Sequence, residues 1–228
     1  GLISYYDATN GDLKVAHCNN VLCNASTTAT IDSTNNVGQY TSITIGADGL
    51  GLISYYDATN GDLKVAHCNN VLCNAATTTT IDSANNVGQY SSITVGDDGL
   101  GLVAYYDSTT QDLRVAHCNN VLCNAATGTT IDSVNNVGQY ASIATGTDGF
   151  GVISYYDGSG LRVAHCNNTL CNTATNYLLD APGNAGQFTS LSIGVDGFGL
   201  ISYYDVNNGD LKVAHLSNKL GAPFARYR

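Results

Sequence analysis

The sequence predicts an all-β fold, and within that class a β-propeller of about five four-stranded blades. The first observation is a repeat with a period near 50 residues, because residues 1–50 and 51–100 are identical at 44 of 50 positions. The second is the abundance of Gly, Asn, Thr and Ser, which favour turns and strands over helix interiors. The third is that short apolar runs alternate with turn residues in every period. A strand-rich repeat of this length is typical of propeller blades.

Each period is expected to form four strands. The pair Asp48-Gly49 is a strong signal for a hairpin between the first two. The second strand is apolar or aromatic on both faces, which indicates that neighbouring blades cover it from both sides. In the first complete period the predicted strands are 40–46, 52–57, 63–68 and 78–83.

We expect one domain over residues 1–228, and one blade edge that is incomplete. The second and third strands of the period occur five times, but the first and the fourth occur only four times. We expect the tail 219–228 to replace one missing strand, and the other edge to stay open or to be completed by a segment absent from this chain or by a neighbouring chain. The repeats are 1–50, 51–100, 101–150, 151–198 and 199–228.

The charge of the chain limits its partners. The formal net charge is −10 at pH 7, with 18 Asp, no Glu, and eight Lys and Arg. Binding to nucleic acid needs a basic surface and is therefore excluded. No apolar run of about 20 residues could insert into a membrane. Because the chain has no Met and begins within a repeat, we expect it to be a processed or trimmed product.

Four C-x4-C pairs indicate disulfides. The fifth repeat has Leu216 and Gly221 at these positions, so both cysteines are lost together, as expected for bonded partners. A metal site of His17, Cys18 and Cys23 is the alternative, but structural zinc prefers closer cysteine spacing and four ligands. Disulfides imply an oxidising compartment, hence a secreted or cell-surface protein. The predicted pairs are Cys18–Cys23, Cys68–Cys73, Cys118–Cys123 and Cys166–Cys171.

Three recurring residues are candidate ligand contacts. The second tyrosine of each tandem pair either stacks on a sugar or packs between blades. The histidine that ends the third strand either contacts a ligand or packs in the blade with a hydrogen-bonded neighbour. The glutamine before the first strand either ties blades together or faces a ligand. The three sets are Tyr6, Tyr56, Tyr106, Tyr156 and Tyr204; His17, His67, His117, His165 and His215; and Gln39, Gln89, Gln139 and Gln187.

The turns between the second and third strands raise the question of calcium. Asp7 and Asp12 flank the turn ATNG, although their spacing is not that of an EF-hand loop. The fourth repeat shortens the turn to DGSGL and loses the equivalent of Asp12, which favours an ordinary turn closed by the aspartate side chain. We therefore expect no metal and no cofactor, with calcium as the alternative.

The stretch YTSITIGADGLGLISYYDATNGDLKVAH (40–67) resembles the repeats of secreted bacterial β-propellers that are loosely related to the BNR/Asp-box group. The resemblance covers nearly the whole chain, but the full Asp-box, Ser-x-Asp-x-Gly-x-x-Trp, is absent because the chain has no Trp. The five-fold repetition is also similar in architecture to five-bladed lectins of the tachylectin type. Such propellers include hydrolases, lectins and surface proteins.

These observations predict a binding or display module rather than an enzyme. A hydrolase needs groups whose environments differ, whereas nearly identical repeats offer nearly identical environments. No G-x-S-x-G, H-E-x-x-H or phosphate-binding loop is present. We expect multivalent binding of surface glycans through equivalent sites. The alternative is a structural protein that assembles with copies of itself by strand exchange at the open blade edge.

Overall fold

The computed structural model describes residues 1–181, 184–218 and 226–227, whose regular structure is all β-strand. The strands form five antiparallel sheets, which we call blades 1 to 5. Blade 1 holds β1 (Leu2–Asp7), β2 (Asp12–Cys18) and β3 (Ser26–Asp32), and blade 2 holds β4 (Val37–Ile45), β5 (Gly51–Asp57), β6 (Asp62–Cys68) and β7 (Ala76–Asp82). Blade 3 holds β8 (Val87–Val95), β9 (Gly101–Asp107), β10 (Asp112–Cys118) and β11 (Ala126–Asp132). Blade 4 holds β12 (Gln139–Thr145), β13 (Gly151–Tyr156), β14 (Leu161–Cys166) and β15 (Ala174–Asp180), and blade 5 holds β16 (Ala185–Ile193), β17 (Gly199–Asp205), β18 (Asp210–His215) and β19 (Arg226–Tyr227).

The all-β prediction is confirmed, and the four predicted strands of the first complete period match β4–β7 to within three residues at each end. The strands β4, β8, β12 and β16 contact one another in turn, and we call them the inner strands. Within the described residues, no helix is long and apolar enough to cross a membrane.

The hydrophobic core lies between neighbouring blades. Leu52, Leu63 and Val65 of blade 2 cluster with Val103 and Tyr105 of blade 3, and similar clusters recur along the chain. All seven residues of β5 and of β9 are buried, because each of these strands has a blade on both faces. This cover explains why the second strand of the repeat carries apolar side chains without alternation.

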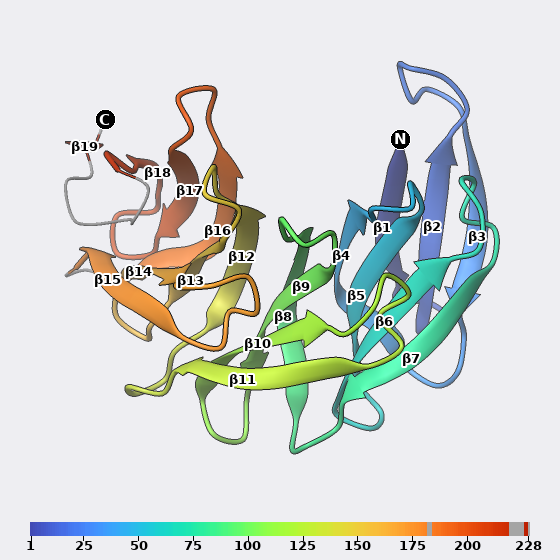
Figure 1. The fold of residues 1–228 in the computed structure, drawn as a ribbon, viewed down its shortest axis with the longest axis horizontal. Helices are drawn as coiled ribbons and strands as arrows, with labels where there is room; N and C mark the ends of the chain where they lie inside the picture. Colours follow the sequence, from blue (N-terminus) through green and yellow to red (C-terminus); the bar gives the residue numbers. More distant parts are fainter. Residues whose placement is uncertain (182–183, 219–225, 228) are drawn as a thin grey trace.

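The five blades form an open arc in the part of the chain that is described, with β1 and β17–β18 near its two ends (Figure 1). In blade 5, Leu211 is 79% exposed, whereas its equivalent Leu63 is fully buried. In blade 1, Ile3 is 50% exposed where Ile53 is buried. The apolar faces of the two end blades are therefore uncovered.

The predicted incomplete edge is found at blade 1, which has three strands. The tail supplies β19, which pairs with β18 in the outer position of blade 5, as predicted. The other residues of that predicted segment, 219–225 and 228, lie outside the described residues. The missing strand of blade 1 is an inner strand, since β1 occupies the place that β5 has in blade 2.

Candidate functional site

Each inner strand opens on a bulge that redirects an aromatic side chain. Gly88 has φ +100°, and a Cβ atom there would lie 2.8 Å from the Leu63 Cα of the preceding blade. The pairing register with β9 then shifts between Gln89 and Ser92. Tyr90, inside this shift, has φ 54°, which is left-handed and rare for an aromatic residue. The equivalent residues Tyr40, Tyr140 and Phe188 have φ 51°, 54° and 52°.

The four aromatic rings stand side by side and line one hollow. The ring centroids are 4.6 Å apart for Tyr40 and Tyr90, 4.6 Å for Tyr90 and Tyr140, and 4.5 Å for Tyr140 and Phe188. These spacings are those of favourable aromatic pairs. We call the space of about 290 Å³ that they line the axial hollow. The following residue of each inner strand completes its lining: Thr41, Ser91, Ala141 and Thr189.

The lining of the axial hollow is neutral. Burial, reinforced by the neighbouring Tyr140 and Tyr40, raises the pKa of the Tyr90 hydroxyl above its ordinary value, so this hydroxyl keeps its proton at neutral pH. The lining therefore presents aromatic faces, hydroxyl groups and methyl groups, and no carboxylate is among the eight lining residues.

Four of the predicted tyrosines lie next to the aromatic rings of the hollow, but no predicted Tyr or Gln is among its lining residues; the four are Tyr56, Tyr106, Tyr156 and Tyr204. Gln39 pairs with Tyr56 across β4 and β5, and the Tyr56 ring lies 6.1 Å from that of Tyr40. Tyr56 is 6% exposed, and its hydroxyl donates a hydrogen bond of 2.6 Å to Asn86 in the connection to the next blade. Tyr6, Tyr106 and Tyr156 likewise donate to Asn36, Asn136 and Asn184. Tyr204, in the end blade, is 37% exposed.

The predicted histidines lie away from the hollow. His67 pairs with Leu52, four residues along β5 from Tyr56, or about 13 Å at the rise of a strand. Its Nε2 is 2.8 Å from Oδ2 of Asp48, in the turn between β4 and β5. His117, His165 and His215 lie 2.8, 2.9 and 2.7 Å from Asp98, Asp148 and Asp196. The structure thus places Tyr56, Tyr106, Tyr156 and Tyr204 beside the hollow and the His set away from it, and the ligand role of all three predicted sets stays a prediction.

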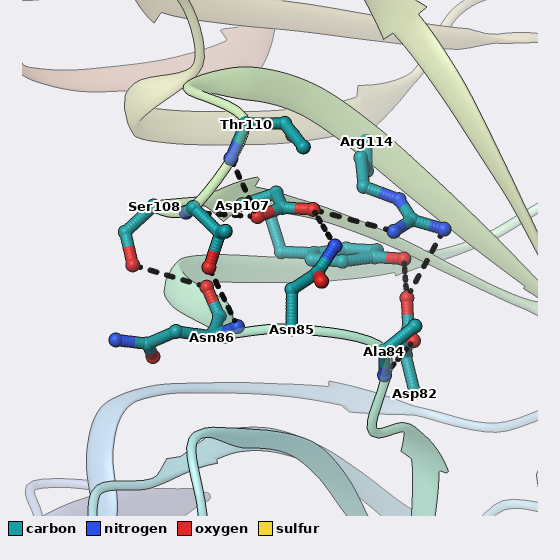
Figure 2. Close-up of polar contacts among 10 residues, drawn as sticks. Asp82, Ala84, Asn85, Asn86, Asp107, Ser108, Thr110 and Arg114 are labelled. Carbon is teal, nitrogen blue, oxygen red and sulfur yellow. Dashed lines mark hydrogen bonds and ion pairs between the residues drawn. The ribbon is translucent and has the colours of Figure 1, made fainter.

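A second polar cluster joins neighbouring blades and is shown in Figure 2. Tyr105 donates a hydrogen bond of 2.6 Å to Asp82, the last residue of the preceding blade's outer strand. Arg114 lies between two carboxylates, with Nη2 3.3 Å from Asp82 and Nη1 3.4 Å from Asp107. Burial, with the hydrogen bond to Asp82, raises the pKa of Tyr105. Because the side chains of Tyr105 and Arg114 bind the two aspartates, we interpret this cluster as a structural contact between blades, which we call a seam.

The four predicted disulfides are present, with Cα–Cα distances of 4.8 to 4.9 Å. Leu216, at the first of the two positions that lack cysteine in repeat 5, is 2% exposed and fills the place of the sulfur atom.

The turn aspartates that were candidate calcium ligands bind their own turns. Asp57 accepts hydrogen bonds from the backbone of Thr59 and from the backbone and side chain of Asn60. Asp7 accepts equivalent bonds and pairs with Lys14 at 2.7 Å. Among the described residues, no group of three or more His, Cys, Asp or Glu is placed to hold a metal ion.

Sequence reasoning missed the main feature of the hollow. In the sequence, Tyr40 is only the first residue of the predicted strand 40–46, and its equivalents are Tyr90, Tyr140 and Phe188. The recurring Gly-Gln-aromatic motif was the available signal, because a glycine before a strand indicates a bulge or a close backbone approach. The alternation of side chains between the two faces of a regular strand would not have predicted the orientation of these rings, because the bulge interrupts that alternation.

The fold and the hollow define a β-propeller-type protein with an aromatic centre. No protein-family model and no curated protein matches the chain. Among solved structures, a GH43 β-1,3-galactosidase is 11% identical over 100% of this chain and 56% of that chain, with a TM-score of 0.65. The chain thus spans little more than half of that enzyme.

Two further structures share the fold. An α-L-arabinofuranosidase from Lactobacillus brevis is 10% identical over 100% of this chain and 92% of that chain, with a TM-score of 0.56. The Aleuria aurantia lectin AAL, in complex with Fucα1-6GlcNAc, is 11% identical over 100% and 77%, with a TM-score of 0.56. These comparisons support the propeller-type architecture. No family model supports the narrower resemblance to the BNR/Asp-box group or to tachylectin-type lectins.

The prediction that the chain is not an enzyme is wrong, because the similar structures include several glycoside hydrolases on this architecture. The error lies in the premise that near-identical repeats give identical environments. At the axis the copies meet, and there they present Thr41, Ser91, Ala141 and Thr189 to one space. A propeller centre therefore combines non-equivalent residues even when the repeats are nearly the same.

Proposed function

We propose that this chain binds carbohydrate in the axial hollow, as a secreted or cell-surface protein. The observation that carries the proposal is the set of four aromatic rings that the recurring bulges hold along one hollow. Aromatic faces stack on the apolar faces of sugar rings, and hydroxyl groups around them exchange hydrogen bonds with sugar hydroxyls.

The backbone conformation supports a binding role. Left-handed φ values at four aromatic residues cost free energy, and such strain concentrates at functional sites. Within the chain the aromatic character is kept at all four positions, while the hydroxyl is absent from Phe188. The shared feature is therefore the ring face rather than the phenol group, as expected for stacking.

The arrangement favours one central site over a set of equivalent ones. The tyrosines on the second strands donate hydroxyl hydrogen bonds to asparagines in the connections to the next blades: Tyr56, Tyr106 and Tyr156. We therefore assign them a structural role beside the hollow. The aromatic rings of four blades meet in one space instead of forming separate pockets. Four disulfides are consistent with an extracellular protein.

The test is binding of oligosaccharides to the Tyr90→Ala variant, measured by isothermal titration calorimetry. The panel contains galactose, arabinofuranose and fucose units, following the two enzymes and the lectin that share the fold. We expect at least about fivefold weaker binding, because one aromatic contact contributes about 1 kcal/mol or more. The control is Tyr177→Ala, which removes a partly buried tyrosine from the outer strand β15 and should leave the affinity unchanged.

Two results would count against the proposal: no binding to any member of the panel, or equal loss in the Tyr90 and Tyr177 variants. Because the fold is shared with glycoside hydrolases, the same oligosaccharides are followed for release of sugar. Turnover that persists in Tyr90→Ala with unchanged KM would place the sugar site elsewhere.

A further inference from the structure

The inner edge of blade 1 is the one place in the described chain where a second strand of the repeat pairs on one side only. Strands β5, β9, β13 and β17 each lie between an inner strand and a third strand, whereas β1 pairs with β2 alone. Ser54 and Leu52 of β5 are 0% and 1% exposed, but the same positions of β1, Ser4 and Leu2, are only half-buried. An uncovered strand edge of this kind is a template for strand addition.

Two kinds of hydrogen bond recur between neighbouring inner strands. The Ser91 hydroxyl donates to the Tyr40 carbonyl at 2.9 Å, and the Thr189 hydroxyl donates to the Tyr140 carbonyl at 2.8 Å. In the second kind, a backbone N–H donates to a serine hydroxyl of the preceding inner strand. These bonds run from Ile93 to Ser42, from Ile143 to Ser92 and from Leu191 to Ser142, at 3.0 to 3.2 Å.

Strand β4 has the donor for the first kind of bond but no preceding inner strand. Thr41 occupies the position of Ser91 and Thr189, and its buried Oγ1 has no hydrogen-bond partner among the described residues. A buried hydroxyl without a partner is unfavourable. In blades 3 and 5 the acceptor for the equivalent hydroxyl is the carbonyl of the aromatic residue in the preceding inner strand.

A second unpaired group lies at the other end of the same edge. The histidines of blades 2 to 5 each pair with the aspartate of the turn that follows their own inner strand. His17 lies at the same position in blade 1, and among the described residues no aspartate pairs with it. The missing partner belongs to a turn of the form Gly-x-Asp-Gly.

We propose that the free edge of β1 is an acceptor site for one further inner strand of this repeat type. The occupant has the pattern Gly-Gln-aromatic-x-Ser-(Ile/Leu)-x-x-Gly-x-Asp-Gly, which all four inner strands share. Its aromatic carbonyl accepts from Thr41 Oγ1, its serine hydroxyl accepts from Ile43 N–H, and its aspartate pairs with His17. A second copy of this chain does not fit the role, because β4, β8, β12 and β16 are each held in their own blades.

The test uses the protein of 228 residues and a synthetic peptide with the sequence of residues 35–50, NNVGQYTSITIGADGL. We expect binding with 1:1 stoichiometry in calorimetry, and slower amide exchange in β1 on binding. A scrambled peptide of the same composition is the control. A peptide with Asp48→Ala should bind about tenfold more weakly, since a charge-assisted hydrogen bond contributes about 1.5 kcal/mol or more.

Two protein variants locate the contacts. His17→Ala should weaken binding of the native peptide about tenfold and leave binding of the Asp48→Ala peptide unchanged, as a double-mutant cycle requires of direct partners. Thr41→Ala should fold normally, because Ala141 stands at the same position of blade 4, and should bind the peptide about fivefold more weakly.

Three results would overturn the proposal. One is absence of peptide binding to the wild-type protein, and another is equal binding of the scrambled peptide. The third is a stable dimer in sedimentation that the peptide does not dissociate, since a second copy would then cover the edge. Additive effects of the two alanine changes would refute the pairing of His17 with the incoming aspartate.

Discussion

At the scale of single residues, the seams between blades depend on one aspartate at the end of each outer strand. Asp82 accepts from Tyr105 and faces Arg114, and Asp32 accepts from Tyr55 and from Lys64 at 2.6 Å. Each aspartate thus neutralises a cation and satisfies a buried phenol of the next blade. Arg114 also reaches Asp107 of its own blade, as Arg162 and Lys212 reach Asp157 and Asp205, so these charges are balanced locally.

Replacing Asp82 by alanine is expected to lower the free energy of unfolding by about 2–4 kcal/mol, because Tyr105 and Arg114 would stay buried without their acceptor. Urea denaturation followed by circular dichroism measures the change. The control is Asp112→Ala at the start of β10 in the neighbouring blade, where a change within about 0.5 kcal/mol is expected. Equal effects of the two substitutions would show that the seam adds nothing to stability.

At the scale of elements, the bulge at the start of each inner strand links packing to the axial hollow. It brings the backbone of Gly88 onto Leu63 of the preceding blade and turns Tyr90 toward the axis. The same two contacts recur in the other inner strands at Gly38, Gly138 and Gly186, which lie against Leu13, Leu113 and Leu161. One local distortion therefore sets both the approach of the blades and the direction of the aromatic rings.

Two glycine substitutions separate conformational strain from steric contact. Both Gly88 and Gly49 have positive φ, but a Cβ atom at Gly49 would meet nothing within 4 Å. Gly49→Ala should therefore lower the free energy of unfolding by only about 1 kcal/mol. Gly88→Ala should lower it by at least about 3 kcal/mol, because the backbone of Leu63 cannot move aside. Thermal melting compares the two, and similar losses would argue against the close approach.

At the scale of the whole molecule, each blade is stabilised by its neighbours, and the two end blades have one neighbour each. Leu200 and Leu211 of blade 5 are 43% and 79% exposed, whereas Leu102 and Leu113 of blade 3 are buried. Stability in such a stack is close to a sum of interactions between neighbours. The ends of the arc are therefore its least stable parts.

Hydrogen exchange followed by mass spectrometry should show this gradient. We expect the amides of β9 and β13 to exchange most slowly, and those of β1–β3 and β17–β18 at least about tenfold faster, because local opening costs least where one face is uncovered. The outer strands of blades 2 and 3 serve as an internal reference. Uniform protection across all five blades would indicate that the ends are covered in solution.

Much of this architecture was predictable because its determinants are local. The hairpin at Asp48-Gly49, the C-x4-C disulfides and the doubly buried second strand depend on residues within one period. The recurrence of His and Tyr was also visible. Their partners were not, since His67 bonds Asp48 at 19 residues' separation and Tyr56 bonds Asn86 at 30.

The period, the strands, their turns and the local bridges follow from the amino-acid sequence, because neighbours along the chain set these features. The three-dimensional packing was needed to show that Tyr40, Tyr90, Tyr140 and Phe188 line one hollow and that Thr41 Oγ1 is buried without a hydrogen-bond partner among the described residues. These residues lie about one repeat apart, and they meet only because stacked blades turn equivalent positions toward a common axis. The bulge interrupts the alternation of side chains along the inner strand and turns the aromatic rings toward this axis. This orientation cannot be predicted from the periodicity of the sequence.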